Sequence, residues 1–541
     1  MQTIESTLDR DSDGYRQNRT GMLDLIAAVR ALEARTVSAS EKSASRFAKR
    51  GQILPRERLA RLLDPGSPFL ELLSLAGYCG IENPDPETSI PGSAIIAGIG
   101  FVSGTRVMVV VNDSGINAGA MQHYSGRKVM RAQEIALEHR LPYVQLVESA
   151  GGNLRDSYRV ERFVVGGGMF RNLARLSAAG LPVIAVVHGS STAGAAYLPG
   201  LSDYVVMVRE RARAFLAGPP LLKAATGEIA TEEALGGADM HAAVSGLGDF
   251  VAETDAEAIS IARDIVHSLD WNRGAATALR AFASPRFDIE DIVGIMPIDY
   301  RKAVDMRQII GRITDASEFN EFRPTYGSAT VCGTGFIEGY AVGFITNNGP
   351  LDPQGATKAA QFIQLCDQAG TSIIYLQNIT GFMVGRASEE AGMIKHGAKL
   401  IQALSNARVP QITVMCGASF GAGNYGMCGR AFSPRFVFSW PNAQTAVMGG
   451  EQAATTMAIV AEESARRRGK PLDQDAVAQE RRGIIETFER QMGAIHTSSL
   501  LLDDGVIDPR DTRRVLAIAL GTCREGEARR LWPMQYGVAR F

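Results

Sequence analysis

The sequence predicts an α/β protein made of two homologous halves, and three observations lead to this prediction. The chain has 541 residues, well beyond the roughly 250–300 at which a single hydrophobic core stops growing. Short runs of β-branched residues, such as 107–111 and 143–147, alternate with helical stretches such as 127–139. Similar segments also recur in the same order at an almost constant offset. A duplicated α/β domain explains all three, with helices on both sides of each sheet because the strands are apolar on both faces.

The internal repeat is the most informative of these observations. Three pairs of segments match at offsets of 235, 230 and 228 residues: AGIGFVSG (97–104) with CGTGFIEG (332–339), PYVQLVESAG (142–151) with SIIYLQNITG (372–381), and LSAAGLPVIAVVHG (176–189) with LSNARVPQITVMCG (404–417). Lys128 and Lys358 lie 230 residues apart and precede equivalent strands. Ordered matches with a slowly drifting offset indicate a duplication with small deletions. We therefore expect an N-terminal domain at 1–285 and a C-terminal domain at 286–541.

Two helical segments at 21–35 and 40–63 precede the first repeated strand, with a break expected near Pro55. Both segments are amphipathic and rich in basic residues. The basic residues of the second segment are Arg46, Lys49, Arg50, Arg56, Arg58 and Arg61. A solvated helix face and a binding surface for an anionic ligand both explain these charges, so both interpretations stay open.

Composition and charge argue against several classes of function. A formal net charge of -2 gives no basic field for nucleic acid, and no run of eighteen apolar residues predicts a membrane span. The six cysteines form no CxxC pair and no cluster with histidine, so we expect neither a metal site nor disulfides. The N-terminal residues are acidic and lack an apolar segment, which predicts a cytoplasmic protein. The seven histidines are scattered, no Walker loop occurs, and no G-x-G-x-x-G motif is followed by the acidic residue of a dinucleotide fingerprint.

Each half ends its third repeated strand in a turn of small residues. The turns read GSSTAGAAY at 189–197 and GASFGAGNY at 417–425. A turn of this kind that leads into a helix presents unpaired backbone N–H groups where the helix dipole favours negative charge. Small side chains let a carbonyl oxygen come within about 2.7–3.1 Å of these nitrogens, as an oxyanion hole requires. Glycine-bearing turns at 148–153 and 378–382 would supply the other amide or the adjacent wall, and two such holes suit a reaction between two carbonyl compounds.

Five long motifs are more specific than the turns alone. They are FLAGPPLLKAATGE (215–228), GGADMH (236–241), NITGFMVG (378–385), GAGNYGMCGRAFSPRF (421–436) and WPNAQTAVMGGEQAA (440–454). Together they resemble the carboxyltransferase (β) subunits of biotin-dependent acyl-CoA carboxylases, over nearly the whole chain. The last three resemble the 3-methylcrotonyl-CoA and geranyl-CoA carboxylase branch rather than the propionyl-CoA branch. The resemblance implies two tandem crotonase-like domains of the ββα spiral type, the first for acyl-CoA and the second for biotin.

The resemblance also assigns residues to the two holes. Ala193 and Gly194 match the pair that holds the thioester oxygen of the acyl-CoA, and Ala422 and Gly423 match the pair that holds the ureido oxygen of biotin. The first hole has one glycine fewer than the family often shows. Further acyl-CoA contacts are expected at Gly151, Gly152, Gly168 and Phe170, and further biotin contacts at Gly381, Phe382 and Gly421.

The family's mechanism and assembly follow as further expectations. Carboxybiotin releases CO2, biotin acts as the base, and in a β-methyl enoyl-CoA the acidic proton lies on the γ carbon, which would be carboxylated. The sequence contains neither a biotinyl Ala-Met-Lys-Met tetrapeptide nor an ATP-binding glycine-rich loop. The resemblance therefore implies a separate biotin carboxylase and biotin carrier (α) subunit. It also implies a homo-hexameric core in which the acyl-CoA half of one protomer faces the biotin half of another.

The acyl substrate is the most open part of this prediction. Residues 164–172 read VVGGGMFRN, with three glycines and a single aromatic residue, Phe170. In the 3-methylcrotonyl enzymes this stretch looks like a bulky aromatic pair, whereas the glycine-rich stretch of the present chain resembles the geranyl enzymes. Arg171 fits neither pattern. We expect a branched C10 enoyl-CoA of the geranyl type. The alternatives are 3-methylcrotonyl-CoA, a propionyl-CoA-type carboxylase, a biotin-dependent decarboxylase, a biotin-independent crotonase and a non-catalytic scaffold.

Overall fold

The computed structural model describes residues 2–152, 160–272, 279–469 and 474–539. Backbone contacts divide the chain into two units. The unit that holds most of the first half, here called the N unit, comprises Arg30–Thr277, Ser499–Leu501 and Gly521–Phe541. The C unit comprises Met1–Val29, Ala278–Ser498 and Leu502–Leu520. Each unit contains one eight-stranded sheet.

Both terminal segments belong to the unit formed mainly by the other half, so the units differ from a single division at residue 285. Strand β1 (Gln2–Thr3) pairs antiparallel with β10 (Glu318–Phe322) in the C unit. Near the other end of the chain, Glu525 forms an ion pair of 2.8 Å with Arg106 in the N unit. The border between the repeated halves at residue 285 stays a prediction.

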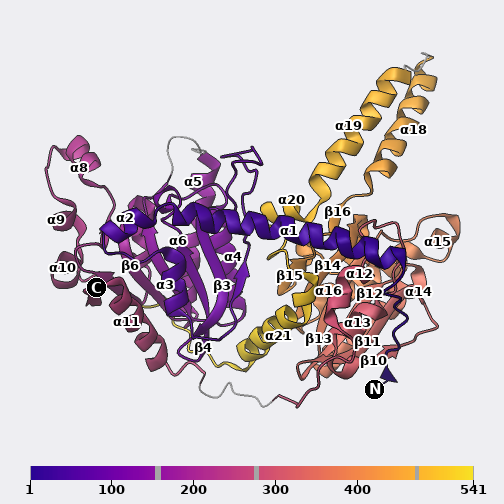
Figure 1. Ribbon diagram of the computed structural model, residues 1–541, viewed down its shortest axis with the longest axis horizontal. Helices are drawn as coiled ribbons and strands as arrows, with labels where there is room; N and C mark the ends of the chain where they lie inside the picture. Colours follow the sequence, from indigo (N-terminus) through magenta and orange to yellow (C-terminus); the bar gives the residue numbers. More distant parts are fainter. Residues whose placement is uncertain (1, 153–159, 273–278, 470–473, 540–541) are drawn as a thin grey trace. The chain divides into compact units, whose positions relative to one another are not determined.

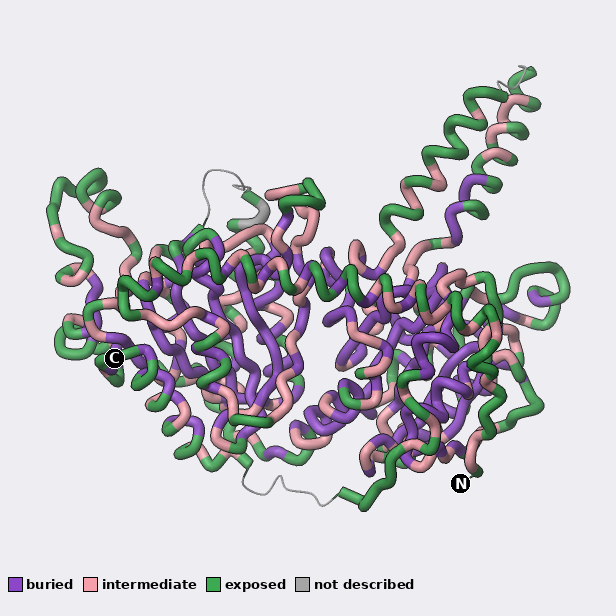
Figure 2. The backbone as a smooth tube through the Cα atoms, in the orientation of Figure 1, coloured by how far each residue is buried: buried purple, intermediate pink, exposed green. Residues whose placement is uncertain are grey.

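The sheet of the N unit has the order β2-β3-β4-β5-β6-β7-β9, with β8 paired to β6. Neighbours from β2 to β4 are antiparallel, and the pairs from β4 onward are parallel. Every residue of β4 and β5 is buried, as expected for strands covered on both faces (Figure 2). The strands are β2 (Leu70–Leu72), β3 (Ile95–Val102), β4 (Thr105–Asn112), β5 (Tyr143–Ser149), β6 (Val183–Thr192), β7 (Tyr204–Val208), β8 (Arg213–Phe215) and β9 (Phe250–Ala252).

The sheet of the C unit repeats this topology from β10 to β16, but it has β1 at one edge and, among its described residues, no strand that matches β9. Its order is β1-β10-β11-β12-β13-β14-β15, with β16 paired to β14, and the pairs from β12 onward are parallel. Its further strands are β11 (Thr330–Ile337), β12 (Tyr340–Asn347), β13 (Ser372–Ile379), β14 (Gln411–Phe420), β15 (Phe436–Ser439) and β16 (Gln444–Ala446). The predicted α/β class with a duplicated sheet is therefore confirmed.

Strand register identifies equivalent residues in the two units. The ladder between β5 and β6 is interrupted by a bulge, after which Ser149 pairs with Ser191. The ladder between β13 and β14 has the same interruption, after which Ile379 pairs with Ser419. These pairs keep the offsets of 230 and 228 residues found in the sequence. Positions on β5 and β6 can thus be compared one by one with positions on β13 and β14.

The helices of the first half begin with α1 (Asp13–Glu41), α2 (Ala44–Lys49) and α3 (Pro55–Leu62). The predicted break near Pro55 is present between α2 and α3, and Pro55 begins α3 because the first position of a helix needs no N–H donor. The others are α4 (Ser125–Glu138), α5 (Val160–Gly166), α6 (Gly168–Ala178), α7 (Tyr197–Gly200), α8 (Pro219–Thr226), α9 (Glu232–Gly236), α10 (Ala238–Met240) and α11 (Asp255–Ser268). No helix of the described residues is long and apolar enough to cross a membrane.

The second half adds a long helical hairpin. Helices α18 and α19 extend together away from the sheet of the C unit (Figure 1). Lys128 on α4 and Lys358 on α14 are both fully buried, as their place in the repeat requires. The helices are α12 (Ile292–Ile295), α13 (Arg307–Ile313), α14 (Pro353–Ala369), α15 (Arg386–Glu390), α16 (Met393–Asn406), α17 (Gly421–Gly426), α18 (Gly450–Arg468), α19 (Gln474–Met492), α20 (Ala494–Ser499) and α21 (Thr512–Ala528).

Candidate active site

The first predicted hole lies where β6 ends. After Thr192 the chain enters a short 3-10 helix at Ala193–Ala196, and Ala193 has a positive φ of 55°. Gly151 of the second predicted turn lies beside it, because a Cβ atom on Gly151 would be 3.0 Å from the Thr192 carbonyl oxygen. The first N–H groups of a helix have no partner within it. The turn can therefore direct backbone N–H groups towards an anionic oxygen.

The second predicted hole has the same construction at the end of β14. Helix α17 begins at Gly421, whose φ of 53° is close to that of the equivalent Ala193. A Cβ atom on Gly423 would be 2.7 Å from Ile379 Cγ1 and 3.0 Å from Gly381 Cα, so a side chain would not fit there. Gly381 itself has a φ of 132°. The structure thus brings together the predicted residues Gly381, Gly421 and Gly423.

The two predicted pairs of amides do not occupy equivalent positions in the repeat, because one pair lies one residue further along the chain than the other. Because Ala193 and Gly421 are equivalent, Gly194 corresponds to Ala422. The predicted pair Ala422 and Gly423 therefore lies one residue further along its turn than the pair Ala193 and Gly194. Which amides act stays a prediction, and Gly194 and Ala422 are the matched positions for a test.

Two residues predicted to contact the acyl group have different surroundings. Phe170 is close to the first hole: its Cζ atom would be 3.5 Å from a Cβ atom on Gly194, and its ring centroid is 5.7 Å from that of Tyr197. Gly168 faces helix α4 instead, because a Cβ atom there would be 2.7 Å from Met130 Sδ. Helix packing, rather than an open channel, explains the glycine at 168.

Gly152 and Phe382 occupy equivalent positions beside the holes. Gly152 is exposed and forms a parallel bridge with Met121. Phe382 forms the equivalent bridge with Leu351, but its ring packs into the C unit, with Cζ 3.0 Å from a Cβ atom built on Gly426. At this position the first hole has no side chain beside it, whereas the second has an aromatic ring that packs into the C unit.

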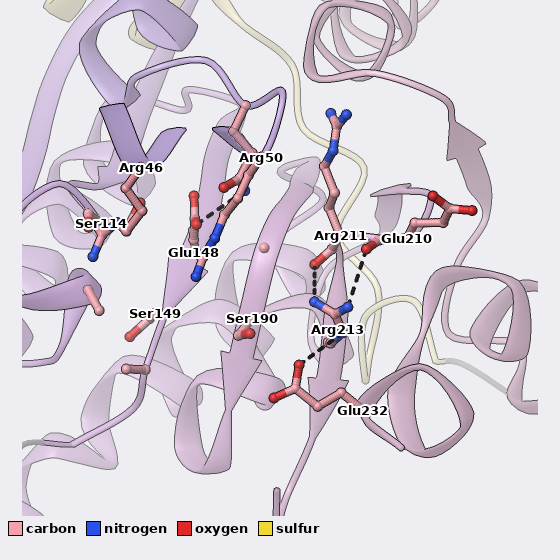
Figure 3. A pocket seen from close by; sticks show the side chains of 14 residues that line it. Arg46, Arg50, Ser114, Glu148, Ser149, Ser190, Glu210, Arg211, Arg213 and Glu232 are labelled. Carbon is pink, nitrogen blue, oxygen red and sulfur yellow. Dashed lines mark hydrogen bonds and ion pairs between the residues drawn. The ribbon is translucent and has the colours of Figure 1, made fainter. Parts of the chain in front are cut away.

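A pocket of about 600 Å³ lies at the ends of β5 and β6 in the N unit (Figure 3). Its lining residues are Arg46, Arg50, Gln52, Ser114, Ala118, Glu148, Ser149, Ala150, Gly189, Ser190, Glu210, Arg211, Arg213 and Glu232. Within the described part of the chain, Arg211 Nη1 is buried and has no hydrogen-bond partner. The pocket favours the anion-binding interpretation of Arg46 on α2 and of Arg50, which directly follows α2. Sequence reasoning missed Arg211, in the turn before β8, and Arg213, the first residue of β8, since isolated charges near short strands form no recognisable pattern.

Behind this pocket, four buried side chains form an ionic network. Arg58 Nη1 lies 2.6 Å from Glu148 Oε2, and Arg58 Nη2 lies 3.1 Å from Asp255 Oδ2. His188 Nδ1 lies 2.9 Å from Asp255 Oδ1. Burial acts to raise the pKa of Asp255, but the hydrogen bond with His188 and the charge of Arg58 lower it to about 2. Burial, reinforced by Arg58, lowers the pKa of His188, so the imidazole is neutral at neutral pH.

The C unit carries neutral residues at three of the equivalent positions. The replacements are Asn378 for Glu148, Cys416 for His188 and Ile309 for Arg58. The last equivalence follows from the helix ends, because Asp64 after α3 and Asp315 after α13 each accept hydrogen bonds from two consecutive backbone N–H groups. The duplicated backbone therefore forms with or without these charges.

Neutral hydrogen bonds stand behind the second hole instead. Ser419 Oγ donates to Gln377 Oε1 at 2.6 Å, and Asn424 Nδ2 donates to Ser419 Oγ at 2.7 Å. Gln377 Nε2 also donates to the carbonyl oxygen of Met427 at 2.7 Å. These bonds join β13 and β14 to helix α17, which carries the predicted biotin residues.

Comparison with known proteins identifies the family, because the carboxyl transferase domain matches residues 46–536. The chain belongs to the carboxyl transferase family. It is 46% identical, over 97% of each chain, to the probable biotin-dependent acyl-coenzyme A carboxylase beta2 subunit of Mycobacterium tuberculosis. It is 44% identical to that organism's biotin-dependent 3-methylcrotonyl-coenzyme A carboxylase beta1 subunit, over 94% of this chain and 95% of the relative. The crystal structure of the P. aeruginosa geranyl-CoA carboxylase beta subunit is 48% identical over 100% of each chain, with a TM-score of 0.92.

These similarities confirm the main functional prediction. The chain is the carboxyltransferase subunit of a biotin-dependent acyl-CoA carboxylase, in the branch that includes the 3-methylcrotonyl-CoA and geranyl-CoA enzymes. It is the β subunit of a multisubunit enzyme. The predicted crotonase-like fold is confirmed as well.

Proposed function

We propose that this subunit transfers CO2 from carboxybiotin to the γ carbon of a branched enoyl-CoA of the geranyl type. The observation that carries the choice of a long acyl chain is the open space beside two glycines. A Cβ atom on Gly166 would meet no atom within 4 Å, and one on Gly167 would meet only the Val164 carbonyl oxygen at 3.8 Å. Both glycines shortly precede Phe170, whose ring lies beside Gly194. The 48% identity to a geranyl-CoA carboxylase subunit supports the same choice.

The acyl-CoA is assigned to the N unit. Its thioester oxygen accepts hydrogen bonds from the backbone N–H groups of Ala193 and Gly194, which act on the negative charge that develops as the enolate forms. Gly151 supports this assignment because it brings a second turn against the same place without a side chain. The CoA phosphates bind in the pocket beside the hole, which is lined by Arg46 on α2 and by Arg50 directly after it.

Biotin is assigned to the C unit, at the turn that contains Ala422 and Gly423. When bound, carboxybiotin supplies both the CO2 and the base that removes the substrate proton. The residues present fit a neutral ureido group, because Gly381 and Gly421 keep the backbone accessible and the side chains behind the turn are uncharged. Phe382 packs into the unit beside this turn and supports its shape.

The position of carboxylation follows from the conjugation of the substrate. In a β-methyl enoyl-CoA the double bond extends the enolate to the γ carbon, so the proton removed there is the acidic one. A second candidate substrate is 3-methylcrotonyl-CoA, which undergoes the same chemistry with five acyl carbons. It is favoured by the packing of Gly168 against Met130, which leaves no channel at that glycine.

Steady-state kcat/KM for the ten-carbon and five-carbon thioesters decides between the two candidates. The chain is reconstituted with its biotin-bearing partner, ATP and bicarbonate, and both substrates are measured on one preparation. We expect the ten-carbon thioester to be used at least as well as the shorter one. A clear preference for the five-carbon substrate contradicts the long-chain proposal.

Gly167→Phe gives a structural test of the same proposal. The phenyl ring would fill the open space, so activity should fall far more on the ten-carbon thioester than on the five-carbon one. Gly167→Ser is the matched control, because it changes the backbone freedom equally but adds little bulk. Gly168→Phe is unsuitable, since its side chain would collide with Met130 before reaching the acyl group.

The partners implied by this function are an α subunit, which carries the biotin carboxylase and the biotin, and further copies of the β subunit. We propose a homo-hexameric β core, and light scattering on the purified subunit should give six times the chain mass of 58.0 kDa. A monomer or dimer at micromolar concentration contradicts this assembly. Carboxylation only in the presence of the biotin-bearing subunit is the expected result for the partner.

A further inference from the structure

Gln52 connects the pocket wall to the strands that lead to the first hole. It lies between α2 and α3, and its Nε2 donates to the carbonyl oxygen of His188 at 3.0 Å and to Glu148 Oε1 at 3.3 Å. Two residues that line the pocket come shortly before it: Arg46 on α2 and Arg50, directly after α2. One side chain thus joins the basic helix to the end of β5 and to β6.

The ionic network continues this connection into the unit. Arg58, from α3, contacts both Glu148 on β5 and Asp255 at the start of α11. The backbone N–H of Ile53 donates to Asp255 Oδ2 at 2.7 Å, and His188 on β6 contacts the other oxygen of the same carboxylate. The loop that follows α2 is therefore held to two strands and one helix by buried, charged groups.

The C unit shows that the fold does not require this network. Neutral residues replace three of its members there, yet the strands have the same register and end in the same kind of turn. The network contains two carboxylates and one guanidinium, with a neutral imidazole. Its excess of negative charge would oppose an enolate rather than stabilise it. A geometric role fits the network better than an electrostatic one.

We propose that Arg58, Asp255 and His188 are positioning residues that act through Gln52 and Glu148. They fix the distance between the arginines of α2 and the turn that holds the thioester, and so set the affinity for the CoA portion of the substrate. This inference rests on the proposed binding of acyl-CoA by the N unit. The network contacts the pocket in which the CoA phosphates are proposed to bind. Its effect on affinity should therefore be the same for substrates that differ only in the acyl chain.

Asp255→Asn tests the inference, because Asp255 does not line the pocket and the change keeps the shape of the side chain. Binding of free CoA to the full-length chain is measured by calorimetry, and KM for the five-carbon and ten-carbon thioesters is measured on the reconstituted enzyme. The dissociation constant for CoA should rise at least fivefold. Both KM values should rise by the same factor, while kcat changes less than twofold.

Arg209→Gln is the matched control. It breaks an exposed ion pair with Glu253 in the same unit, at 2.9 Å, without touching the network. It should leave the dissociation constant for CoA unchanged. His188→Leu is the second variant, for the case that Asp255→Asn does not fold, because His188 does not line the pocket and its removal leaves the ion pairs of Arg58 in place.

An unchanged dissociation constant in a folded Asp255→Asn or His188→Leu variant overturns the inference. So does a rise in KM for only one of the two thioesters, because that would place the effect at the acyl chain. If the wild-type chain binds no CoA, the proposed function fails and the inference fails with it. Wild-type binding with no change in the variants separates the failure of the inference from that of the function.

Discussion

The N unit and the C unit end equivalent strands in equivalent turns, but the side chains behind these turns differ in charge. Arg58, Glu148, Asp255 and His188 are buried together in the N unit. In the C unit, Asn378 and Cys416 stand at the positions of Glu148 and His188, and neighbouring serine and amide side chains make neutral hydrogen bonds. The backbone of the turn therefore forms with either charged or neutral side chains behind it. We infer that function, rather than folding, determines which kind is present.

The difference also matches what each turn is proposed to bind. A CoA thioester is a long ligand with phosphates at one end, so its binding site needs two distant points held at a fixed distance. The ureido group of biotin is small and neutral, and it needs only one accessible turn. Buried charges are costly to desolvate, and behind the turns the network of Arg58, Glu148, Asp255 and His188 is formed in the unit where the long ligand is proposed to bind.

The largest expected effect concerns the guanidinium of the N unit. Arg58→Met leaves Glu148 and Asp255 buried without their cation, and such a loss typically costs about 3–5 kcal/mol of stability. Urea denaturation should show this loss in the N unit. Arg209→Met, which breaks only exposed ion pairs, is the control and should cost less than about 1 kcal/mol. Equal stabilities of the two variants would show that Arg58 is not essential to the network.

The next effect compares the two turns directly, by placing valine at the matched positions Gly194 and Ala422. A branched side chain keeps the carbonyl oxygen from the amides, and losing one donor of this kind costs about 10²–10³ in kcat. Gly194→Val should still fold, because its Cβ has the nearest neighbour at 3.5 Å. Gly423→Val is less informative, because its Cβ would be only 2.7 Å from Ile379 and would disturb the turn itself.

The two valine variants should differ in one further measurement. ATP hydrolysis that requires bicarbonate but no acyl-CoA reports on the use of carboxybiotin alone. Gly194→Val should leave this hydrolysis intact, while Ala422→Val should reduce it. If Gly194→Val reduced it and Ala422→Val did not, the thioester and biotin would have to be assigned to the opposite units.

The turns could be predicted from sequence because each is a local pattern, and the repeat could be predicted because its segments match in order. A run of small residues after an apolar strand is visible within ten residues, and ordered matches are visible without any structure. The ionic network could not be predicted in this way. Arg58 and Asp255 are 197 residues apart and lie on separate helices, so only the folded chain shows that they meet.

Gly168 shows a second limit of sequence reasoning. The sequence does not distinguish a helical glycine that leaves room for a ligand from one that lets two helices pack closely. Its contact with Met130 on α4 shows that close packing is the reason at 168, while Gly166 and Gly167 face open space. The exchange of terminal segments between the units is hidden for a similar reason, because a two-residue strand such as β1 has no signature of its partner.

A smaller effect is expected from adding a charge to the C unit. Asn378→Asp places a carboxylate at the position of Glu148, but Ile309 stands where Arg58 would neutralise it. Asn378 is half-buried, so the unpaired carboxylate should cost less than a buried group without its partner, which costs about 1–3 kcal/mol, and the midpoint of urea denaturation should fall slightly. The isosteric change Glu148→Gln removes a charge at the matched position of the N unit and serves as the comparison. A fully stable Asn378→Asp variant would show that solvent alone compensates for the missing cation at position 378.

The smallest effect is a difference in pH dependence between the wild-type chain and His188→Gln. Burial, followed by the charge of Arg58, lowers the pKa of His188 below its ordinary value of about 6.5. As the pH falls below about 6.5, the unfolded chain binds a proton at this imidazole that the folded chain does not bind. The free energy of unfolding should therefore decrease, with a contribution of at most about 1.4 kcal/mol per pH unit.

Cys416, at the matched position of the C unit, makes no such contribution, because burial raises the pKa of its thiol and it stays neutral. His188→Gln gives the N unit a side chain that likewise does not titrate but can still donate to Asp255. Between about pH 7.5 and 5.5, the wild-type chain should lose about 1 kcal/mol more than the variant in urea denaturation. Other titrating groups are common to both proteins and cancel in this difference. Parallel stability curves would mean that the folded chain binds the proton at His188 as readily as the unfolded chain does, and the pKa of this imidazole would then not be lowered by the network.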